Sequence, residues 1–249
     1  MKRYANKTVL VTGGNSGIGL ATAVQFAKEG ARVVITGRDQ ATLDGAVHII
    51  GGQTIALKND QASIQDGRLL AQTLADQGIT LDAVFVNAGV AKFAPFADID
   101  EALWDQTFDV NVKGAYFLIQ ALAPLLNRGA AIVLNGSINA HIGMPSSSVY
   151  AASKAALISL ARTLSTELLG QGARVNVVSP GPVTTPLYDR LGLEPDQLGE
   201  MAAAIQGQIP LKRFGTPDEI ASAVLFLASP EAAYIVGAEL VADGGMIAL

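Results

Sequence analysis

The stretch of sequence that decides the fold reads TVLVTGGNSGIGLATAVQFAKEG and spans residues 8–30. It begins with a short run of β-branched and apolar residues, passes through several glycines and continues with apolar residues at helical spacing. We therefore predict a strand, a tight turn and a helix in immediate succession. That succession opens a βαβ unit, in which parallel strands are joined by crossover helices.

Three glycines in this turn suit a nucleotide diphosphate. Gly13 permits the tight turn, Gly17 lets a diphosphate approach the backbone, and Gly19 allows the helix to pack closely on the strand. Free backbone amides at the start of the helix then favour the anion. An ordinary glycine-rich turn is the alternative, but the strand before it and the helix after it favour nucleotide binding.

The alternation of short β-branched runs with longer helical patterns continues along the chain. Strands are expected near residues 8–12, 32–36, 54–57, 81–87, 130–136, 174–179 and 238–242. Helices are expected near residues 17–29, 40–50, 63–77, 101–127, 149–169 and 217–228. We therefore predict a single α/β domain over residues 1–249, a doubly wound parallel sheet of about seven strands flanked by helices. Such sheets bind ligands beyond the carboxyl ends of their strands.

One segment, residues 183–213, breaks this alternation. It carries Pro, Gly and weakly amphipathic pieces without a convincing strand, which is typical of an insertion over a site. Its end is well defined, because Thr216-Pro217-Asp218-Glu219 has the pattern of a capping box that begins the next helix. We expect this segment to act as a lid over bound cofactor.

Charge and composition disfavour several other classes of protein. The chain has 17 Lys and Arg against 22 Asp and Glu, and its net charge of −5 disfavours nucleic acid and membranes as partners. It has no cysteine, and His48 and His141 lack metal-ligand spacing, so no metal site is predicted. No signal-peptide pattern follows the basic start, and no apolar run approaches the roughly 18 residues of a membrane span. We expect a cytoplasmic location.

The end of the second predicted strand bears on the choice of cofactor. An acid there would grip the ribose hydroxyls of NAD, but the sequence reads Gly37-Arg38-Asp39. Arg38 is placed to pair with the 2′-phosphate of NADP, and Asp39 is placed to cap the following helix. The alternative is a solvated Arg38 with Asp39 on the ribose. We expect NADP ahead of NAD.

Two further strand ends offer cofactor contacts. Asp60 follows the third predicted strand, where its carboxylate could meet the adenine amino group or cap the helix that begins near Ser63. The fourth strand ends in Asn87-Ala88-Gly89, whose small residues let the backbone lie against a cofactor. Asn87 could also tie adjacent strand ends together.

The residues that suggest chemistry follow the fifth predicted strand. Ser137 ends that strand, and Tyr150 and Lys154 lie four apart on one face of the next helix. Carbonyl reduction needs a proton as well as a hydride, and an ordinary tyrosine, with a pKa of about 10, ionises reluctantly near neutrality. The Lys154 ammonium and an oxidised nicotinamide would lower the pKa of Tyr150. Tyr150 would then serve as acid and base, and Ser137 would bond the substrate oxygen.

These residues resemble those of a known family, the short-chain dehydrogenase/reductases. Asn111, Ser137, Tyr150 and Lys154 match its catalytic tetrad in order and approximate spacing. The segment from Thr12 to Gly19 resembles its cofactor motif, and Asn87-Ala88-Gly89 resembles its Asn-Ala-Gly element. By itself Asn111 would be unremarkable, because a mid-helix asparagine is usually solvated or bonded to the backbone. The resemblance covers nearly the whole chain.

The resemblance implies a Rossmann-type fold and an NAD(P)-dependent oxidoreductase that acts on CH–OH or carbonyl groups. It also implies that Lys154 bonds the nicotinamide ribose and that Asn111 holds a water in a proton relay. The segment from Pro180 to Thr185 resembles the part of the family that contacts the nicotinamide carboxamide. Cofactor contacts are therefore expected at Gly13, Asn15, Ser16, Gly17, Ile18, Gly19, Gly37, Arg38, Asp60, Asn87, Ala88, Gly89, Tyr150, Lys154, Pro180, Gly181, Val183 and Thr185.

Three functions are compatible with these motifs. The first is NADPH-dependent, reversible reduction of a ketone or aldehyde to an alcohol. The second is reduction of a 3-oxoacyl thioester on an acidic acyl carrier protein, which would call for a basic patch near the site. Arg128 and Arg174 are the candidates for such a patch, although both fit solvated positions beside strands. The third is a non-catalytic, NADP-binding regulatory protein, since a fold alone does not prove an activity.

Substrate contacts and assembly are the least constrained expectations. Apolar residues after the fifth strand and in the segment 183–213 are the candidates for substrate binding. They are Ile142, Met144, Leu187 and Tyr188, with Met201 as a further possibility. His141 is a polar candidate in the same loop, and a structural hydrogen bond is the alternative role for it. The apolar C-terminal tail, residues 246–249, leads us to expect burial at a subunit contact in a homotetramer, as is common in the family.

Overall fold

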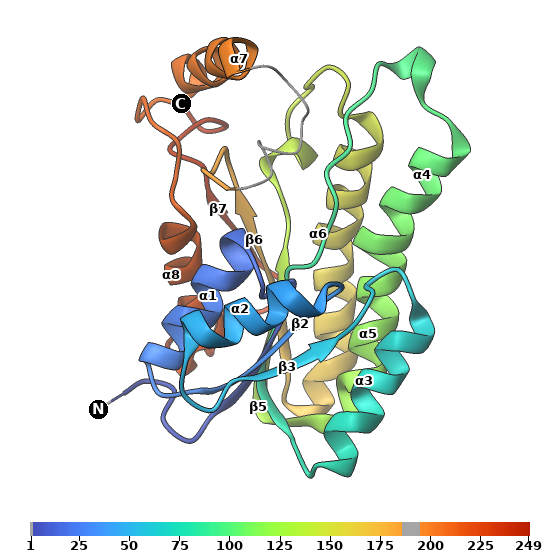
Figure 1. Ribbon diagram of the computed structural model, residues 1–249, viewed down its shortest axis with the longest axis vertical. Helices are drawn as coiled ribbons and strands as arrows, with labels where there is room; N and C mark the ends of the chain where they lie inside the picture. Colours follow the sequence, from blue (N-terminus) through green and yellow to red (C-terminus); the bar gives the residue numbers. More distant parts are fainter. Residues whose placement is uncertain (1, 186–194) are drawn as a thin grey trace.

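A parallel sheet of seven strands forms the centre of the molecule (Figure 1). The computed structural model describes residues 2–185 and 195–249. The strands lie in the order β3-β2-β1-β4-β5-β6-β7. Their bounds are β1 (Thr8–Thr12), β2 (Arg32–Gly37), β3 (Ile55–Lys58), β4 (Leu81–Val86), β5 (Leu126–Asn135), β6 (Arg174–Pro180) and β7 (Glu239–Ala242). The strand order reverses between β1 and β4, which is where doubly wound sheets bind their ligands.

Helices cover both faces of this sheet (Figure 1). One face carries α1 (Gly17–Lys28), α2 (Gln40–Ile50) and α8 (Pro217–Ala228). The other carries α3 (Ile64–Asp76), α4 (Glu101–Phe108), α5 (Gly114–Leu122) and α6 (Ser148–Leu168). A further helix, α7 (Pro195–Gln208), lies above the carboxyl ends of the strands. Among the described residues, no helix is both long and apolar enough to cross a membrane.

The alternation of side chains along each strand divides the core into two apolar layers. In β1, Leu10 faces the layer shared with α3, α5 and α6, whereas Val9 and Val11 face the layer shared with α1, α2 and α8. Because both faces are covered, the central strands β1, β4 and β6 are largely buried on both sides, and β1 and β4 are mostly apolar. The predicted doubly wound α/β fold is confirmed.

One expectation about element boundaries is wrong in detail. The helix expected over residues 101–127 is interrupted by a π-helical turn, Asp109–Lys113, between α4 and α5, and the chain has already entered β5 at Leu126. The start of α5 lies against the segment after β3, where a Cβ on Gly114 would collide with the carbonyl oxygen of Gln61. The segment 183–213 holds a helix, α7, which its weak amphipathic pattern did not predict.

Candidate active site

The turn after β1 has the backbone conformation that its glycines predict. Gly13 and Gly17 have φ angles of 62° and 52°, in the left-handed region that favours glycine. A Cβ on Gly19 would collide with the carbonyl oxygen of Gly13, so only glycine lets α1 pack this closely on the turn. Gly13 and Gly19 therefore have the backbone roles expected of them, and the approach of a diphosphate at Gly17 stays a prediction.

The start of α1 is left open to an anion. Ser16 occupies the N-cap position, but its side chain makes no capping hydrogen bond, and the first turn of the helix has no acidic residue. The first backbone amides of a helix lack partners within the helix and carry partial positive charge. Both Ser16 and Gly17 line the cavity described next. A phosphate group is the natural partner for such a helix start.

A cavity of about 500 Å³ runs along the carboxyl ends of the strands, from the glycine turn to Tyr150 and Lys154. It has the size of a small-molecule or cofactor site. It brings together 18 of the residues predicted as catalytic or cofactor-binding. They are Gly13, Asn15, Ser16, Gly17, Ile18, Gly37, Arg38, Asp60, Asn87, Ala88, Gly89, Ser137, Tyr150, Lys154, Pro180, Gly181, Val183 and Thr185. The glycine turn, the open helix start and this elongated cavity together fit a dinucleotide.

Several predicted residues lie elsewhere. Gly19 is buried behind the turn, and Asn111 is buried in the π-helical turn. His141, Ile142 and Met144 are not among the residues that line the cavity. Leu187 and Tyr188 lie outside the described residues.

The cavity also includes residues that the sequence did not single out. They are Thr36, Thr42, Asn59, Gln61, Val90, Ala91, Val110, Asn135 and Gly136. Asp39, considered above as a ribose contact, lines the cavity as well. Thr36 and Asn135 lie at the carboxyl ends of β2 and β5. Their positions at predicted strand ends could have identified them in the sequence as residues near a ligand.

Asn87 joins three strand ends, as one interpretation of the sequence proposed. Its Nδ2 atom donates to the carbonyl oxygens of Thr12 at 2.9 Å and Gly13 at 3.3 Å. Its Oδ1 atom accepts from Nδ2 of Asn135 at 3.0 Å. The hydroxyl of Thr12 accepts from the backbone amides of Asn87 and Ala88. These bonds hold the ends of β1, β4 and β5 at fixed spacing beneath the cavity.

At the end of β2, Asp39 caps the following helix, as the sequence predicts, and Arg38 is left for a ligand. The carboxylate of Asp39 caps α2 by accepting from the backbone amide of Thr42 at 2.8 Å, and this bond lowers the pKa of Asp39. Arg38 is exposed at the cavity and makes no hydrogen bond or ion pair within the described part of the chain. Its guanidinium group is therefore free to meet a ligand.

Asp60 does not cap α3. That cap is Ser63, whose hydroxyl accepts from the backbone amide of Asp66 at 3.1 Å. The carboxylate of Asp60 accepts instead from the backbone amide of Ala62 at 3.1 Å, and Asp60 lines the cavity. Of the two roles considered for Asp60, capping is thus filled by another residue.

Ser137, Tyr150 and Lys154 come together at the other end of the cavity. The Oγ atom of Ser137 accepts from the backbone amide of Asn139 at 3.2 Å. The Nζ atom of Lys154 donates to the carbonyl oxygen of Asn135 at 2.6 Å and lies 5.7 Å from the centre of the Tyr150 ring. A serine hydroxyl, a phenol and a buried amine therefore share one corner of the site.

Burial dominates the acid–base properties of this corner. It lowers the pKa of Lys154 to about 8, because an ammonium group loses its water shell there. It also raises the pKa of Tyr150, and the hydrogen bond with the Ser137 side chain only partly opposes that rise. The expected lowering of this pKa rested on the Lys154 ammonium together with an oxidised nicotinamide. In the protein alone, desolvation of the phenol sets the direction of the shift.

Asn111 holds the backbone after β4 in place. Its Oδ1 atom accepts from the amide of Val90 at 2.8 Å, and its Nδ2 atom donates to the carbonyl of Val90 at 2.9 Å. The same Nδ2 atom donates to the hydroxyl of Ser153 at 3.0 Å. The side chain of Asn111 thus links the π-helical turn to α6, beside Lys154, and this wider turn is what brings it there.

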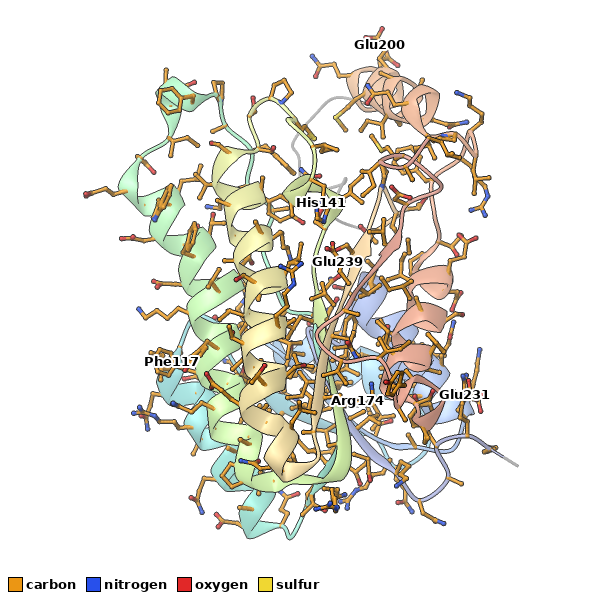
Figure 2. All side chains as sticks on the ribbon, turned by 180° about the vertical axis from the view of Figure 1, so that it is seen from behind. Phe117, His141, Arg174, Glu200, Glu231 and Glu239 are labelled. Atoms are coloured by element: carbon orange, nitrogen blue, oxygen red, sulfur yellow. The ribbon has the colours of Figure 1, made fainter. Side chains whose placement is uncertain are left out.

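His141 has a partner on the far edge of the sheet. Its Nε2 atom lies 2.7 Å from Oε1 of Glu239 on β7, and Figure 2 shows the two side chains close together. The bond ties the turn that follows Ser137 to the edge strand. It agrees with the structural interpretation of His141 that the sequence allowed.

Arg128 and Arg174 do not form a basic patch at the site. Both lie near the amino ends of their strands, whereas the cavity lies at the carboxyl ends. Arg174 is only 8% exposed, so the expectation of a solvated arginine is wrong for it (Figure 2). Its guanidinium group donates to the carbonyl oxygens of Leu227, Ser229 and Ile235 at 3.1–3.2 Å and so secures the end of α8. Within the described residues, no group of three His, Cys, Asp or Glu side chains could hold a metal ion.

Comparison with known proteins agrees with this geometry. Residues 13–247 match a family model described as enoyl-(acyl carrier protein) reductase. The chain is 36% identical to 2-(S)-hydroxypropyl-CoM dehydrogenase 3 of Xanthobacter autotrophicus, with 99% of each chain covered. It is 34% identical to the 3-oxoacyl-[acyl-carrier-protein] reductase FabG of Thermotoga maritima, over 98% of this chain and 99% of the relative.

Solved structures point the same way. A short-chain dehydrogenase/reductase from Brucella melitensis, described as glucose/ribitol dehydrogenase, superposes with a TM-score of 0.92 at 33% identity, with 99% of each chain covered. An NADP complex of RhlG from Pseudomonas aeruginosa superposes with a TM-score of 0.91 at 32% identity, over 99% of this chain and 100% of the other. The chain belongs to the short-chain dehydrogenase/reductase family. It is an oxidoreductase of alcohol or carbonyl groups in a family that uses NAD(P) cofactors.

Proposed function

We propose that this protein catalyses the reversible, NADPH-dependent reduction of a ketone or aldehyde to an alcohol. The observation that carries the proposal is the convergence of Ser137, Tyr150 and Lys154 at one end of a cavity whose other end is the glycine turn. The bound nicotinamide supplies the hydride in reduction and accepts it in oxidation. The protein has to hold the carbonyl oxygen and deliver a proton to it.

Tyr150 is the proposed proton donor. A phenol with a raised pKa is fully protonated near neutrality, which suits an acid in reduction. Ser137 shares a hydrogen bond with the phenol and is placed to hold the same substrate oxygen as charge develops on it. In oxidation the phenol must release its proton first, and positive charge beside it favours that release.

Lys154 is the proposed source of part of that charge. With a pKa of about 8 it is mostly protonated at neutral pH, and its bond to Asn135 keeps it below the phenol ring. We also assign it the nicotinamide ribose hydroxyls as partners, because it lines the cavity beside Tyr150.

Asn111 remains part of the proposed proton relay, with one amendment. Both ends of its amide are already bonded to Val90 and Ser153. Its side chain therefore acts first as a positioning group for the strand end and for α6.

Arg38 supports NADP as the preferred cofactor. It lies exposed at the cavity without a partner in the described part of the chain, while Asp39 is occupied in capping α2. A guanidinium group pairs well with a phosphate through charge-assisted hydrogen bonds. The similar structure of RhlG is an NADP complex, which is in keeping with this preference.

Reduction of a carrier-bound 3-oxoacyl thioester is the second candidate, favoured by the similarity to the Thermotoga maritima reductase. Arg128 and Arg174 lie too far from the cavity to receive an acidic carrier there, so a free carbonyl compound is preferred. A panel of ketones, aldehydes, alcohols and acyl thioesters, run with NADPH and NADH, tests the proposal. Turnover of free carbonyls with NADPH supports it. A strong thioester preference, or a protein that binds NADPH and turns over nothing, contradicts it.

A homotetramer in the cytoplasm completes the proposal. Leu249 at the C-terminus is 97% exposed, and Trp104 on α4 is 47% exposed while its ring stacks on Phe108. Large apolar side chains left open in this way are typical of subunit contacts. Sedimentation at micromolar concentration would show a tetramer, and a monomer there would contradict this part.

A further inference from the structure

An aromatic side chain outside the predicted site packs directly on Tyr150. The ring centres of Phe93 and Tyr150 lie 5.6 Å apart with planes at 63°, an edge-to-face contact. Phe93 is 37% exposed and follows Val90 and Ala91, which line the cavity. A phenyl ring that is partly open to solvent therefore lies beside the phenol that handles the proton.

A second large apolar side chain lies on the Ser137 side. Met144 is 42% exposed, and its sulfur lies 3.6 Å from Nδ2 of Asn139. The backbone amide of Asn139 donates to the hydroxyl of Ser137. Met144 is thus anchored to the turn that holds Ser137, as Phe93 is packed on the ring of Tyr150.

The two loops that carry these side chains are joined to each other. The backbone amide of Ala94 donates to the carbonyl oxygen of Ser146 at 2.9 Å, and the hydroxyl of Ser147 donates to the carbonyl oxygen of Met144 at 2.7 Å. Both loops rise above the carboxyl ends of the strands, near the start of α6 (Figure 1). Phe93 and Met144 each lie within two residues of this shared hydrogen bond.

We infer that Phe93 and Met144 form an apolar entrance that selects carbonyl compounds with an aromatic or bulky aliphatic group beside the reacting carbon. This inference rests on the proposed function and names the substrate class of the same site. With the carbonyl oxygen held by Ser137 and Tyr150, the substituent would meet the Phe93 ring that packs on Tyr150 and the Met144 thioether that is attached to the turn of Ser137. Aromatic rings stack on phenylalanine, and thioethers adapt to rings and alkyl groups of different shapes.

A pair of methyl ketones tests the inference. Acetophenone and butanone carry the same reacting methyl ketone group and differ in the phenyl or ethyl substituent. We expect the wild-type protein to have a kcat/KM for acetophenone at least tenfold above that for butanone. Phe93→Ala should reduce this ratio about tenfold, mainly through the KM of acetophenone, because the ring loses its stacking partner.

Phe96→Ala is the matched control, since Phe96 lies three residues further along and is 89% exposed. It should leave the ratio unchanged. An equal loss of kcat/KM for both ketones in Phe93→Ala would contradict the inference. It would indicate that Phe93 only holds the Tyr150 ring in place and does not contact the substituent. A wild-type preference for butanone would also contradict it.

A binding measurement keeps the inference testable even if the proposed reaction fails. N-methylbenzamide and N-methylacetamide present a carbonyl oxygen that is not reduced. Titrated into the NADP-loaded protein, the benzamide should bind at least fivefold more tightly, and Phe93→Ala should remove that difference. Equal affinity of the wild-type protein for the two amides would overturn the inference. Tighter binding of the benzamide without turnover of any ketone would overturn only the proposed reaction.

Discussion

The Nζ atom of Lys154 lies 2.6 Å from the carbonyl oxygen of Asn135, so α6 is attached to the carboxyl end of β5 at the end of the cavity that Tyr150 lines. Lys154 is 5% exposed, and burial lowers the pKa of its amine to about 8. A positively charged group is held there against its own desolvation. Such an arrangement favours function over stability.

Replacing this amine should stabilise the protein in a pH-dependent way. Because the folded-state pKa of Lys154, about 8, lies below the ordinary value of 10.5, charging it opposes folding below pH 8, and the opposition fades between pH 8 and 10.5. Lys154→Met should therefore raise the free energy of unfolding at pH 7 by up to about 3 kcal/mol, reduced by the lost bond to Asn135.

Urea denaturation at pH 7 and pH 9.5 measures this effect. The gain from Lys154→Met should shrink at the higher pH. Lys92→Met, at an exposed lysine, should show no such trend. A Lys154→Met protein whose stability relative to the wild type is the same at both pH values would contradict the buried-charge account.

Arg38 should control the choice between the two cofactors. Arg38→Ala should weaken NADPH binding about 10–100-fold, the effect of losing charge-assisted hydrogen bonds to a phosphate, and leave NADH binding nearly unchanged. Fluorescence titration with both cofactors measures it. Arg32→Ala is the control, because Arg32 is exposed at the other end of β2. Parallel losses for NADPH and NADH would argue against a 2′-phosphate contact.

Two glycine substitutions should have opposite effects. Gly19→Ala places a Cβ against the carbonyl oxygen of Gly13, so it should lower both the melting temperature and NADPH affinity. Gly45→Ala, in the exposed middle of α2 with open space around it, should stabilise the protein by roughly 0.5–1 kcal/mol. Thermal unfolding with and without NADPH distinguishes them. An unperturbed Gly19→Ala protein would mean that the turn is looser than the structure shows.

Arg174 should be important for stability alone. Arg174→Met leaves the carbonyl oxygens of Leu227, Ser229 and Ile235 without their donor, so it should cost about 2–4 kcal/mol. Arg128→Met, at an exposed arginine, should be nearly neutral. Neither change should alter the ratio of acyl-thioester to ketone turnover. A selective loss of thioester activity would contradict this prediction and indicate that the substituted arginine helps to bind an acyl carrier protein.

The periodicity of the sequence was enough to predict the sheet and most of the site. The β-branched runs form strands of a sheet whose two faces are both covered by helices, so their apolar side chains are needed on both sides. Most of the predicted cofactor contacts follow those strands directly. The π-helical turn at Asn111 escaped prediction because apolar spacing continues through it, and the wider turn depends on contacts with Val90 and Ser153.

Contacts between distant segments were beyond reach for a different reason. Phe93 is in a loop without periodicity, and only the folded chain brings it against Tyr150. His141 and Glu239 are 98 residues apart, and their bond depends on how the edge strand is placed. The raised pKa of Tyr150 likewise depends on burial, which spacing along the helix does not reveal.

The most direct test of the proposed chemistry is a single turnover of a ketone with NADPH in which both C4 hydrogens of the nicotinamide are deuterium, in the wild-type protein and in Tyr150→Phe. The wild type should place one deuterium on the carbinol carbon for each NADPH consumed. Tyr150→Phe should slow this step by about 10²–10⁴-fold and still bind NADPH, because it removes only the proton donor. Transfer at the wild-type rate in Tyr150→Phe, or no transfer by the wild type, would contradict the account.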